Sequence, residues 1–154
     1  MPKKWMKDKA EIEKVLEETD FGFLGMSNQG KPYVVPMSFA YKDNKIYLHA
    51  ALKGLKIEYL RNNPEVCFTV ATLNELIQNH NDLCDYSLRY RSVIARGKAR
   101  LLSDLDEKIT ALTILGRKYA QGTLSSGVDR QKAEVTAVIV IEIEEMTGKY
   151  NVSA

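Results

Sequence analysis

Apolar residues recur at helical spacing in three parts of the chain. Asp8 and Glu11 resemble a capping box at the start of the first, whose apolar face continues to about residue 20. A shorter helix is predicted over 52–60, and Pro64 stops it. The third helix follows a cap at 103–104 and has the clearest periodicity of the chain. Its stripe, expected to pack in the core or against a second subunit, consists of Leu105, Ile109, Leu112, Leu115 and Tyr119.

Alternating and continuously apolar stretches predict strands between these helices. The six predicted strands span residues 21–26, 31–41, 46–50, 66–71, 90–102 and 136–145. Pro36 interrupts the second strand, and because proline cannot donate to a sheet ladder, it implies an edge, a bulge or a break in pairing. Gly97 indicates a bulge or a close approach of backbones in the fifth. Residues 72–87 are polar without a regular pattern, so we predict irregular structure there.

Hairpins connect most of these elements, and strands do not alternate regularly with helices. This order predicts a mainly β fold in which six antiparallel strands form a small barrel with about three peripheral helices. The length of 154 residues suits a single domain over 1–154.

Charge and composition narrow the classes of partner. The chain has 22 basic and 20 acidic residues and a net charge of +2. This balance lacks the large excess of basic residues that is typical of nucleic-acid-binding proteins. Its longest apolar run, 137–141, is far shorter than the roughly 20 residues of a membrane span, and the N-terminal segment has no apolar signal core. Cys67 and Cys84 are its only cysteines. We expect a cytoplasmic protein with two free thiols and no nucleic-acid or membrane partner.

Several well-known catalytic motifs are absent from the sequence. It has no glycine-rich phosphate loop, no GxSxG elbow and no HExxH zinc motif. His80 and Cys84 stand four residues apart, but a closed metal site needs more ligands than two histidines and two cysteines readily supply. We therefore predict no metal site.

The predicted second helix and the strands before it carry the most suggestive chemistry. Backbone groups near Pro36 are freed from regular pairing and can bond the edge of a planar heterocycle. The small residues after His49 permit close approach of a ligand. Gly54 then opens a helix that presents Lys53 and Lys56, and a helix N-terminus with added ammonium groups is a natural site for a dianion.

A second group of donors occurs later in the chain. Arg91 offers a forked guanidinium and Ser92 a hydroxyl, and both are suited to phosphate. Taken alone, each of these features is also compatible with an ordinary solvated surface.

Together, the motifs resemble the flavin-binding split-barrel superfamily of the pyridoxamine-phosphate-oxidase type, and within it most closely the nitroimidazole-resistance branch. The resemblance rests, in chain order, on Gly22-Phe-Leu-Gly25, Gly30-Lys-Pro-Tyr-Val-Val-Pro36, Ile46-Tyr-Leu-His-Ala50, Gly54-Leu-Lys56, Asn63-Pro64, Cys84-Asp85, Tyr90-Arg-Ser-Val-Ile94, Gly97-Lys-Ala99, Asp106-Glu-Lys-Ile-Thr-Ala-Leu112 and Thr147-Gly-Lys149. These motifs span most of the chain.

The resemblance implies a six-stranded split β-barrel that forms a homodimer and binds two flavin mononucleotides (FMN) at the subunit interface. The implied ring-lining residues are Val35, Pro36, Met37 and Ser38; those near the phosphoribityl arm and phosphate are His49, Ala50, Ala51, Lys53 and Lys56; those completing the site are Tyr90, Arg91, Ser92 and Val93. The motif fixes Lys53 and Tyr90 less tightly than the others.

The resemblance also implies an activity. We expect a flavin-dependent oxidoreductase that reduces a small electrophile, such as a nitroaromatic compound, with NAD(P)H or another reductant as donor. His49 is the candidate catalytic residue, because an imidazole can donate a proton to the reduced group near neutral pH. Pyridoxamine-phosphate oxidases proper close with a basic and aromatic motif that residues 148–154 lack, so that activity is not expected. The alternatives are a flavin carrier or sensor without turnover, and a haem-handling protein on the same barrel.

Overall fold

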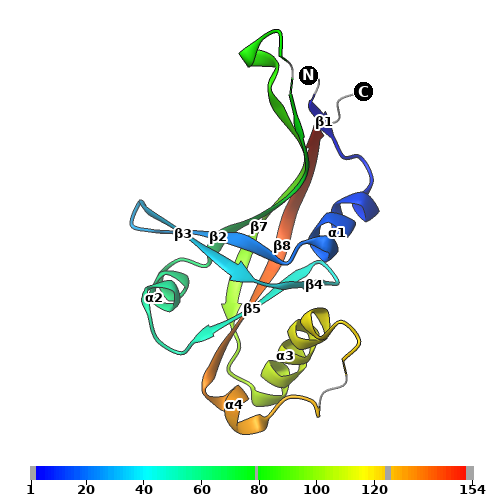
Figure 1. The fold of residues 1–154 in the computed structure, drawn as a ribbon. Coiled ribbons are helices and arrows are strands. Elements are labelled where there is room, and N and C mark those ends of the chain that lie inside the picture. The colour runs from blue at the N-terminus through cyan, green and yellow to red at the C-terminus, as the bar shows by residue number, and fades with distance from the viewer. Residues whose placement is uncertain (1–2, 79, 124–125, 152–154) are drawn as a thin grey trace.

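The structure is a computed structural model that describes residues 3–78, 80–123 and 126–151 (Figure 1). Its elements are β1 (Lys3–Trp5), α1 (Lys9–Glu18), β2 (Phe21–Asn28), β3 (Lys31–Ser38), β4 (Ala40–Lys42), β5 (Lys45–Ala51), α2 (Leu55–Asn62), β6 (Glu65–Ile77), a 3₁₀ turn (Leu83–Asp85), β7 (Ser87–Leu101), α3 (Leu105–Ala120), α4 (Arg130–Glu134) and β8 (Thr136–Asn151). The mainly β class is confirmed, and so are the six predicted strands and three predicted helices. The structure adds β1 and α4, and it divides the predicted strand 31–41 into β3 and β4.

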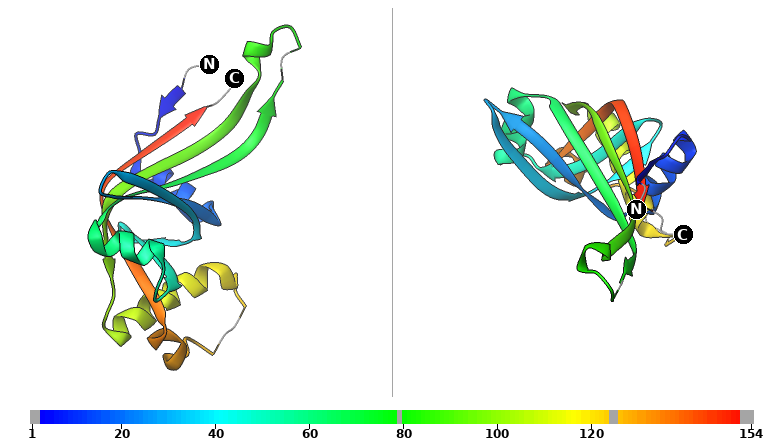
Figure 2. Two further views of the ribbon diagram at one scale, coloured as in Figure 1. Left: turned by 90° about the vertical axis from the view of Figure 1, so that its left-hand side faces the viewer. Right: turned by 90° about the horizontal axis from the view of Figure 1, so that it is seen from above.

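The strands form one antiparallel sheet in the order β3-β2-β6-β7-β8-β5-β4. Phe39 alone separates its two end strands, β3 and β4, so the chain joins the ends of the sheet and the sheet curls into a barrel (Figure 2). Phe39 and Phe68 are fully buried inside the barrel with their ring centroids 4.9 Å apart. β3 pairs only with β2 at the end of the sheet, so the edge is the one of the three alternatives left open for Pro36 that the structure shows.

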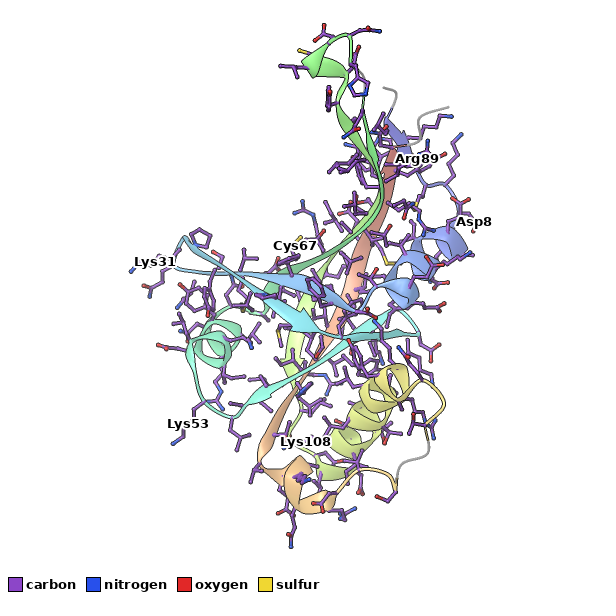
Figure 3. The ribbon with its side chains drawn as sticks, viewed as in Figure 1. Asp8, Lys31, Lys53, Cys67, Arg89 and Lys108 are labelled. Atoms are coloured by element: carbon purple, nitrogen blue, oxygen red, sulfur yellow. The ribbon has the colours of Figure 1, made fainter. Side chains whose placement is uncertain are left out.

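Strands β6, β7 and β8 continue beyond the barrel as an arm, with β1 paired to the end of β8 (Figures 1 and 2). The prediction of irregular structure over 72–87 is wrong for 72–77 and for Ser87, which belong to β6 and β7, whereas the described residues between them contain only the 3₁₀ turn. A register shift between Leu73 and Glu75 places an extra residue in β6, and this bulge breaks the alternation by which a strand is recognised. Figure 3 shows Arg89 on the arm, at the opposite end of the molecule from Lys53.

α1 and α3 begin where the sequence predicts, whereas α2 begins at Leu55, three residues after the start of the predicted range 52–60. Asp8 accepts a hydrogen bond from the Ala10 amide (3.0 Å), and Asp104 accepts one from the Glu107 amide (2.9 Å). α1 then buries the apolar face that its spacing predicts.

The buried face of α3 is rotated from the predicted stripe. Its buried residues are Lys108, Ala111 and Leu115, whereas most of the stripe is only half-buried. Lys108 can be buried because its ammonium donates to the Glu134 carbonyl (3.2 Å). The buried face covers the outer side of β8, where Val138 and its neighbours are also buried. Both faces of β8 are therefore apolar at this point.

Within the described part of the chain, no helix is long and apolar enough to cross a membrane.

Candidate functional site

The N-terminus of α2 is a well-formed anion-binding feature. Gly54 is the N-cap at φ 138°, a conformation that favours glycine, and no side chain caps the helix. The Glu58 amide donates to the Gly54 carbonyl (3.1 Å), which leaves the amides of 55–57 without a helical partner. Lys53 is exposed and Lys56 half-buried, and neither forms an ion pair within the described residues. These donors and charges match the chemistry of a phosphate dianion.

Strand β3 comes beside β5 just before this helix. The two strands are in contact but form no ladder. Ala40 pairs with Tyr47 in the β4–β5 ladder, and this register, continued past the break at Phe39, puts Ser38 opposite His49. Backbone groups left unpaired in the split between the strands can bond the edge of a planar ligand. The structure thus brings together the predicted segments of β3, β5 and α2.

The β3 segment offers few side chains to a ligand. Pro36 is exposed and Ser38 half-buried on the outer face of the strand. Val35 and Met37 point the other way, and Met37 is buried in the barrel core. Val35 and Met37, two of the four residues predicted to line a ring, can therefore offer a ligand only their backbone groups.

The β5 segment alternates in the same way. His49 and Ala51 are exposed on the outer face, whereas Ala50 packs against the core. The His49 imidazole is therefore open to a ligand, and Ala51 leaves space beside it.

The β7 segment divides between the two faces of the sheet. Tyr90 and Ser92 are half-buried on the outer face, while Val93 is buried in the core. Arg91 points toward α1, where its Nη2 lies 2.7 Å from Glu18 Oε2, and its buried Nε has no hydrogen-bond partner. Arg91 is thus held by an ion pair that the sequence did not predict.

The structure does not bring the β7 segment to the other three. β5 pairs with β8 at His49 and Val138, whereas β7 pairs with β8 at Ser92 and Lys149. Those two pairs are eleven residues apart along β8. Across the sheet, Pro36 of the β3 segment and Ile94 beside the β7 segment are three strand spacings apart, about 14 Å at roughly 4.8 Å per strand, with β2 and β6 between them. One chain therefore contains two separate halves of the predicted site.

An apolar face covers the outer side of the sheet between these halves. Its exposed side chains are Phe21 (55%), Phe23 (42%), Val34 (61%), Leu73 (63%), Leu88 (44%) and Ile94 (40%). The register places Phe23, Thr69 and Ile94 side by side and Pro36 next to Phe23. Ser92 lies on the same side of β7 as Ile94. A pocket of about 560 Å³ borders this apolar face at Val34, but its wall also contains Glu65, Arg96, Glu144 and Glu145. Exposed apolar surface of this extent marks an interaction site.

A family model described as pyridoxamine 5'-phosphate oxidase matches residues 8–150. The chain belongs to this family. The resemblance predicted from its motifs is confirmed.

Two solved structures and one sequence relative resemble the chain over most of its length. The crystal structure of a proposed 5-nitroimidazole antibiotic resistance protein from Bacteroides thetaiotaomicron is 34% identical, has a TM-score of 0.84, and is matched over 96% of this chain and 87% of that one. A flavocytochrome from Azotobacter vinelandii is 24% identical with a TM-score of 0.81, over 97% of this chain and 70% of that one, and supports the fold alone. An uncharacterized protein of Rhizobium meliloti strain 1021 is 27% identical over 148 residues, which are 90% of this chain and 89% of that protein.

In this member of the pyridoxamine 5'-phosphate oxidase family, the end of α3 holds the junction between β3 and β4. The Phe39 amide donates to Tyr119 Oη (2.8 Å), and the hydroxyl can donate to the carbonyl of Phe39 (2.9 Å) or of Asp20 (2.6 Å). Burial raises the pKa of Tyr119, so the hydroxyl keeps its proton. Because Phe39 directly follows the β3 segment, these bonds fix its position. The sequence signalled Tyr119 only as the last member of an apolar stripe.

Lys118 reinforces the same junction. Its ammonium donates to the Thr19 carbonyl (2.5 Å) and lies 3.7 Å from the centroid of the Phe39 ring. Burial lowers the pKa of Lys118 from 10.5 to about 8, with the Asp20 carboxylate opposing the shift.

We expect this lowered pKa to make stability depend on pH. Between pH 8 and pH 10.5 the unfolded chain binds more protons at Lys118 than the folded chain, so the free energy of unfolding rises with pH. After discounting for partial exposure, the gain from pH 7.5 to pH 9.5 is about 1 kcal/mol. Urea unfolding at the two pH values measures it in wild-type protein and in Lys118→Met. An exposed lysine, Lys98, supplies the control Lys98→Met, which should retain the gain that Lys118→Met loses.

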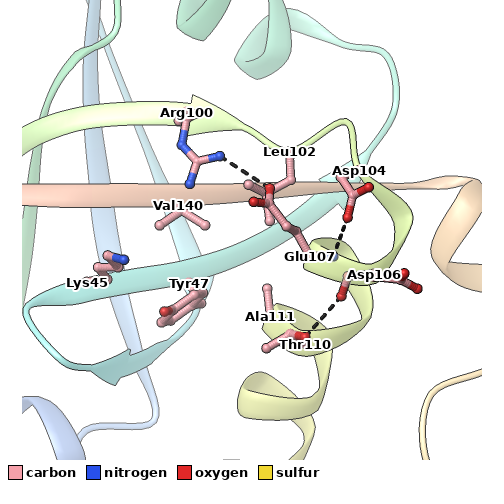
Figure 4. Close-up of a pocket in the computed structure, with 10 residues that line it drawn as sticks. All are labelled: Lys45, Tyr47, Arg100, Leu102, Asp104, Asp106, Glu107, Thr110, Ala111 and Val140. Atoms are coloured by element: carbon pink, nitrogen blue, oxygen red, sulfur yellow. Dashed lines mark hydrogen bonds and ion pairs between the residues drawn. The ribbon is translucent and has the colours of Figure 1, made fainter.

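A pocket of about 340 Å³ at the start of α3 contains none of the predicted site residues (Figure 4). Its wall is acidic, with Asp104, Asp106 and Glu107, but Asp104 caps the helix and Arg100 lies 3.5 Å from Glu107. Arg130 likewise pairs with Asp106 (3.2 Å). These carboxylates serve structural contacts, so the pocket is not part of the candidate site.

Proposed function

We propose that two copies of this chain form a homodimer that binds FMN in two sites between the copies and acts as an oxidoreductase. The exposed apolar face on β2 and β6, which separates the two halves of the predicted site by about 14 Å, carries this proposal. A second copy packed on the apolar face would bring its β7 segment to the first copy's α2, and symmetry would produce the second site. The same packing would cover the exposed aromatic residues of β2.

The donor set at α2 fits the phosphate of FMN. The amides of 55–57, with Lys53 and Lys56, would bind the phosphate, and the split between β3 and β5 would receive the edge of the ring. Ser92 and Tyr90 of the partner copy would close the site from the other side. FMN, when bound, supplies the transfer of two electrons from a donor such as NAD(P)H.

The substrate we propose is a small electrophile such as a nitroaromatic compound. The relative proposed to act in 5-nitroimidazole resistance, which is 34% identical, supports this class. His49 is exposed at the edge of the site, where its imidazole can donate a proton to an oxygen of the substrate. The free thiols Cys67 and Cys84 suit a reducing compartment, and we propose the cytoplasm.

An absorbance spectrum and a gel filtration run test the cofactor and the assembly together. Purified protein, loaded with FMN and desalted, should keep bands near about 370 and 450 nm. It should elute at about twice the chain mass of 17.4 kDa. Loss of all flavin on desalting, or elution as a monomer that retains flavin, would each contradict the proposal. A Soret band in place of the flavin bands would favour the haem alternative.

We expect His49→Ala to slow substrate reduction about 100-fold or more while FMN binding changes little, because a general acid typically contributes about 10²- to 10⁴-fold. Stopped-flow reoxidation of the reduced protein by a nitroaromatic compound measures the effect. The matched control is His80→Ala, which alters an exposed histidine on the arm. Equal rates in the two variants would remove His49 from the mechanism. If the reduced wild-type protein is not reoxidised by the compound at all, the protein is a flavin carrier without turnover and His49 has no catalytic role.

A further inference from the structure

A second pocket, separate from the proposed flavin site, lies between α1, β4 and α3. In Figure 1, β4 runs between the two helices, and it contacts both. The pocket measures about 350 Å³, at the lower end of the range for small-molecule sites. None of the residues predicted for flavin binding lines it. We call it the α1–α3 pocket.

Three cations line the α1–α3 pocket against one carboxylate. The cations are Lys42, Arg117 and Lys118, and the carboxylate is Glu17. Lys42 and Arg117 form no ion pair within 3–78, 80–123 and 126–151. Glu13, nearby on α1, is already engaged, since it accepts a hydrogen bond from the Tyr41 hydroxyl (2.7 Å) and pairs with Lys9 (3.7 Å). The wall therefore has an excess of positive charge that the protein itself does not neutralise.

The Lys118 ammonium adds positive charge to the same wall, although it already donates to the Thr19 and Leu16 carbonyls. It is half-buried, and burial lowers its pKa to about 8 because the charged form loses hydration. The Asp20 carboxylate partly offsets this loss, and Glu17 lines the same pocket. A negative charge in the pocket would restore favourable electrostatics around this amine.

The remaining wall is apolar. Ala40 is buried at the base of β4, Ile114 is half-buried on α3, and the Tyr41 ring lies beside them. Inorganic phosphate would leave this surface unused, whereas an organic acid would cover it. We propose that the α1–α3 pocket binds a small organic carboxylate, whose charged group faces Lys42, Arg117 and Lys118 and whose apolar body packs on Ala40 and Ile114.

Calorimetric titration of the full chain with sodium benzoate tests the proposal, with benzyl alcohol as the neutral counterpart of similar shape. We expect saturable binding of benzoate with a dissociation constant of about 1 mM or lower, and no binding of benzyl alcohol at the same concentrations. Inorganic phosphate should not compete with benzoate. The readout does not depend on flavin, so it can succeed or fail independently of the proposed function.

Variants locate the binding in the α1–α3 pocket. Arg117→Gln should weaken benzoate binding about tenfold, because it removes one charge-assisted contact. Arg61→Gln, which alters an exposed arginine on α2, is the matched control and should bind like wild-type protein. Ile114→Trp, which fills the pocket from a half-buried position, should abolish binding, and its thermal unfolding checks that it folds.

Three outcomes overturn the proposal. Equal binding of benzyl alcohol would mean that the cations take no part. Equal affinities for Arg117→Gln and Arg61→Gln would place the benzoate elsewhere. Competition by phosphate at similar concentration would show a site for a simple anion rather than for an organic acid.

Discussion

A heterodimer of one Lys56→Glu chain and one Ser92→Leu chain is expected to bind one FMN, although neither homodimer binds any. In the proposed arrangement each site takes Lys56 from one chain and Ser92 from the other. The heterodimer thus has one site with both substitutions and one site with neither. Reversal of the charge at Lys56 should weaken FMN binding at least about 100-fold, since a buried or partly buried phosphate would face a carboxylate. Ser92→Leu adds bulk but keeps the apolar face apolar.

A second heterodimer makes the test decisive. It pairs a wild-type chain with a chain that has both substitutions, so each of its two sites would contain one altered half. We expect this heterodimer to bind no FMN. If each site lay within a single chain, the outcomes would be reversed, because the wild-type chain would keep an intact site and the first heterodimer would have none.

Co-expression of the two chains with different affinity tags and purification over both isolates each heterodimer. Flavin per dimer is then read from the absorbance near 450 nm against protein concentration. Homodimers of each variant are the controls, and gel filtration shows whether they still assemble. Flavin in the second heterodimer but not in the first would refute the shared site while leaving FMN binding itself intact.

The local elements of this protein follow closely from its sequence. Asp8 and Asp104 cap their helices as predicted, and Gly54 begins α2 in a conformation that suits glycine. These signals depend on a few neighbouring residues, so they can be recognised from one sequence without knowledge of the fold. The six strands were found for the same reason, since each alternates or is apolar over its own length.

Two features could not be predicted because they depend on contacts between distant segments. The extra residue near Asn74 shifts the alternation of β6, so its extension into the arm gave no regular pattern. Likewise, nothing near Arg91 in sequence reveals its ion pair with Glu18, 73 positions earlier. Local periodicity contains no information on such pairs.

The arrangement of the candidate site also depends on contacts between distant segments. The motifs identified the residues of both halves, and the resemblance implied that they form one site. Only the order and register of the strands show that β2 and β6 lie between the halves within one chain. The role of Tyr119 was also missed, because the residue it holds, Phe39, is 80 positions away.

Gly97→Ala is expected to lower the free energy of unfolding by about 3 kcal/mol or more. A Cβ at this position would lie 2.0 Å from the Glu142 carbonyl oxygen and 3.1 Å from Ile143 Cα. Both are backbone atoms, which cannot rotate away, so β7 and β8 would have to separate. For a chain of this length the melting temperature should fall by about 6–12 °C, measured by calorimetry or circular dichroism.

Gly116→Ala is the matched control. Gly116 lies inside α3 and is exposed, and a Cβ there would meet nothing within 4 Å. The same substitution should therefore raise the free energy of unfolding by about 0.5–1 kcal/mol, because alanine favours the helix. A loss of stability below 1 kcal/mol for Gly97→Ala would contradict the close approach of the two strands.

The position of Gly97 connects this stability effect to the proposed site. Arg96 pairs with Glu145 but Gly97 pairs with Ile143, so β8 has one extra residue at this point. This bulge lies within the barrel, since Ala95 and Val93 beyond it are still part of the core, and a bulge bends its strand. Strands that separate here would displace Ser92, five residues along β7. We therefore expect the Gly97→Ala protein, measured below its melting temperature, to bind FMN more weakly than the Gly116→Ala protein. Neither glycine lies in the proposed site, so the difference would come from the displaced strand.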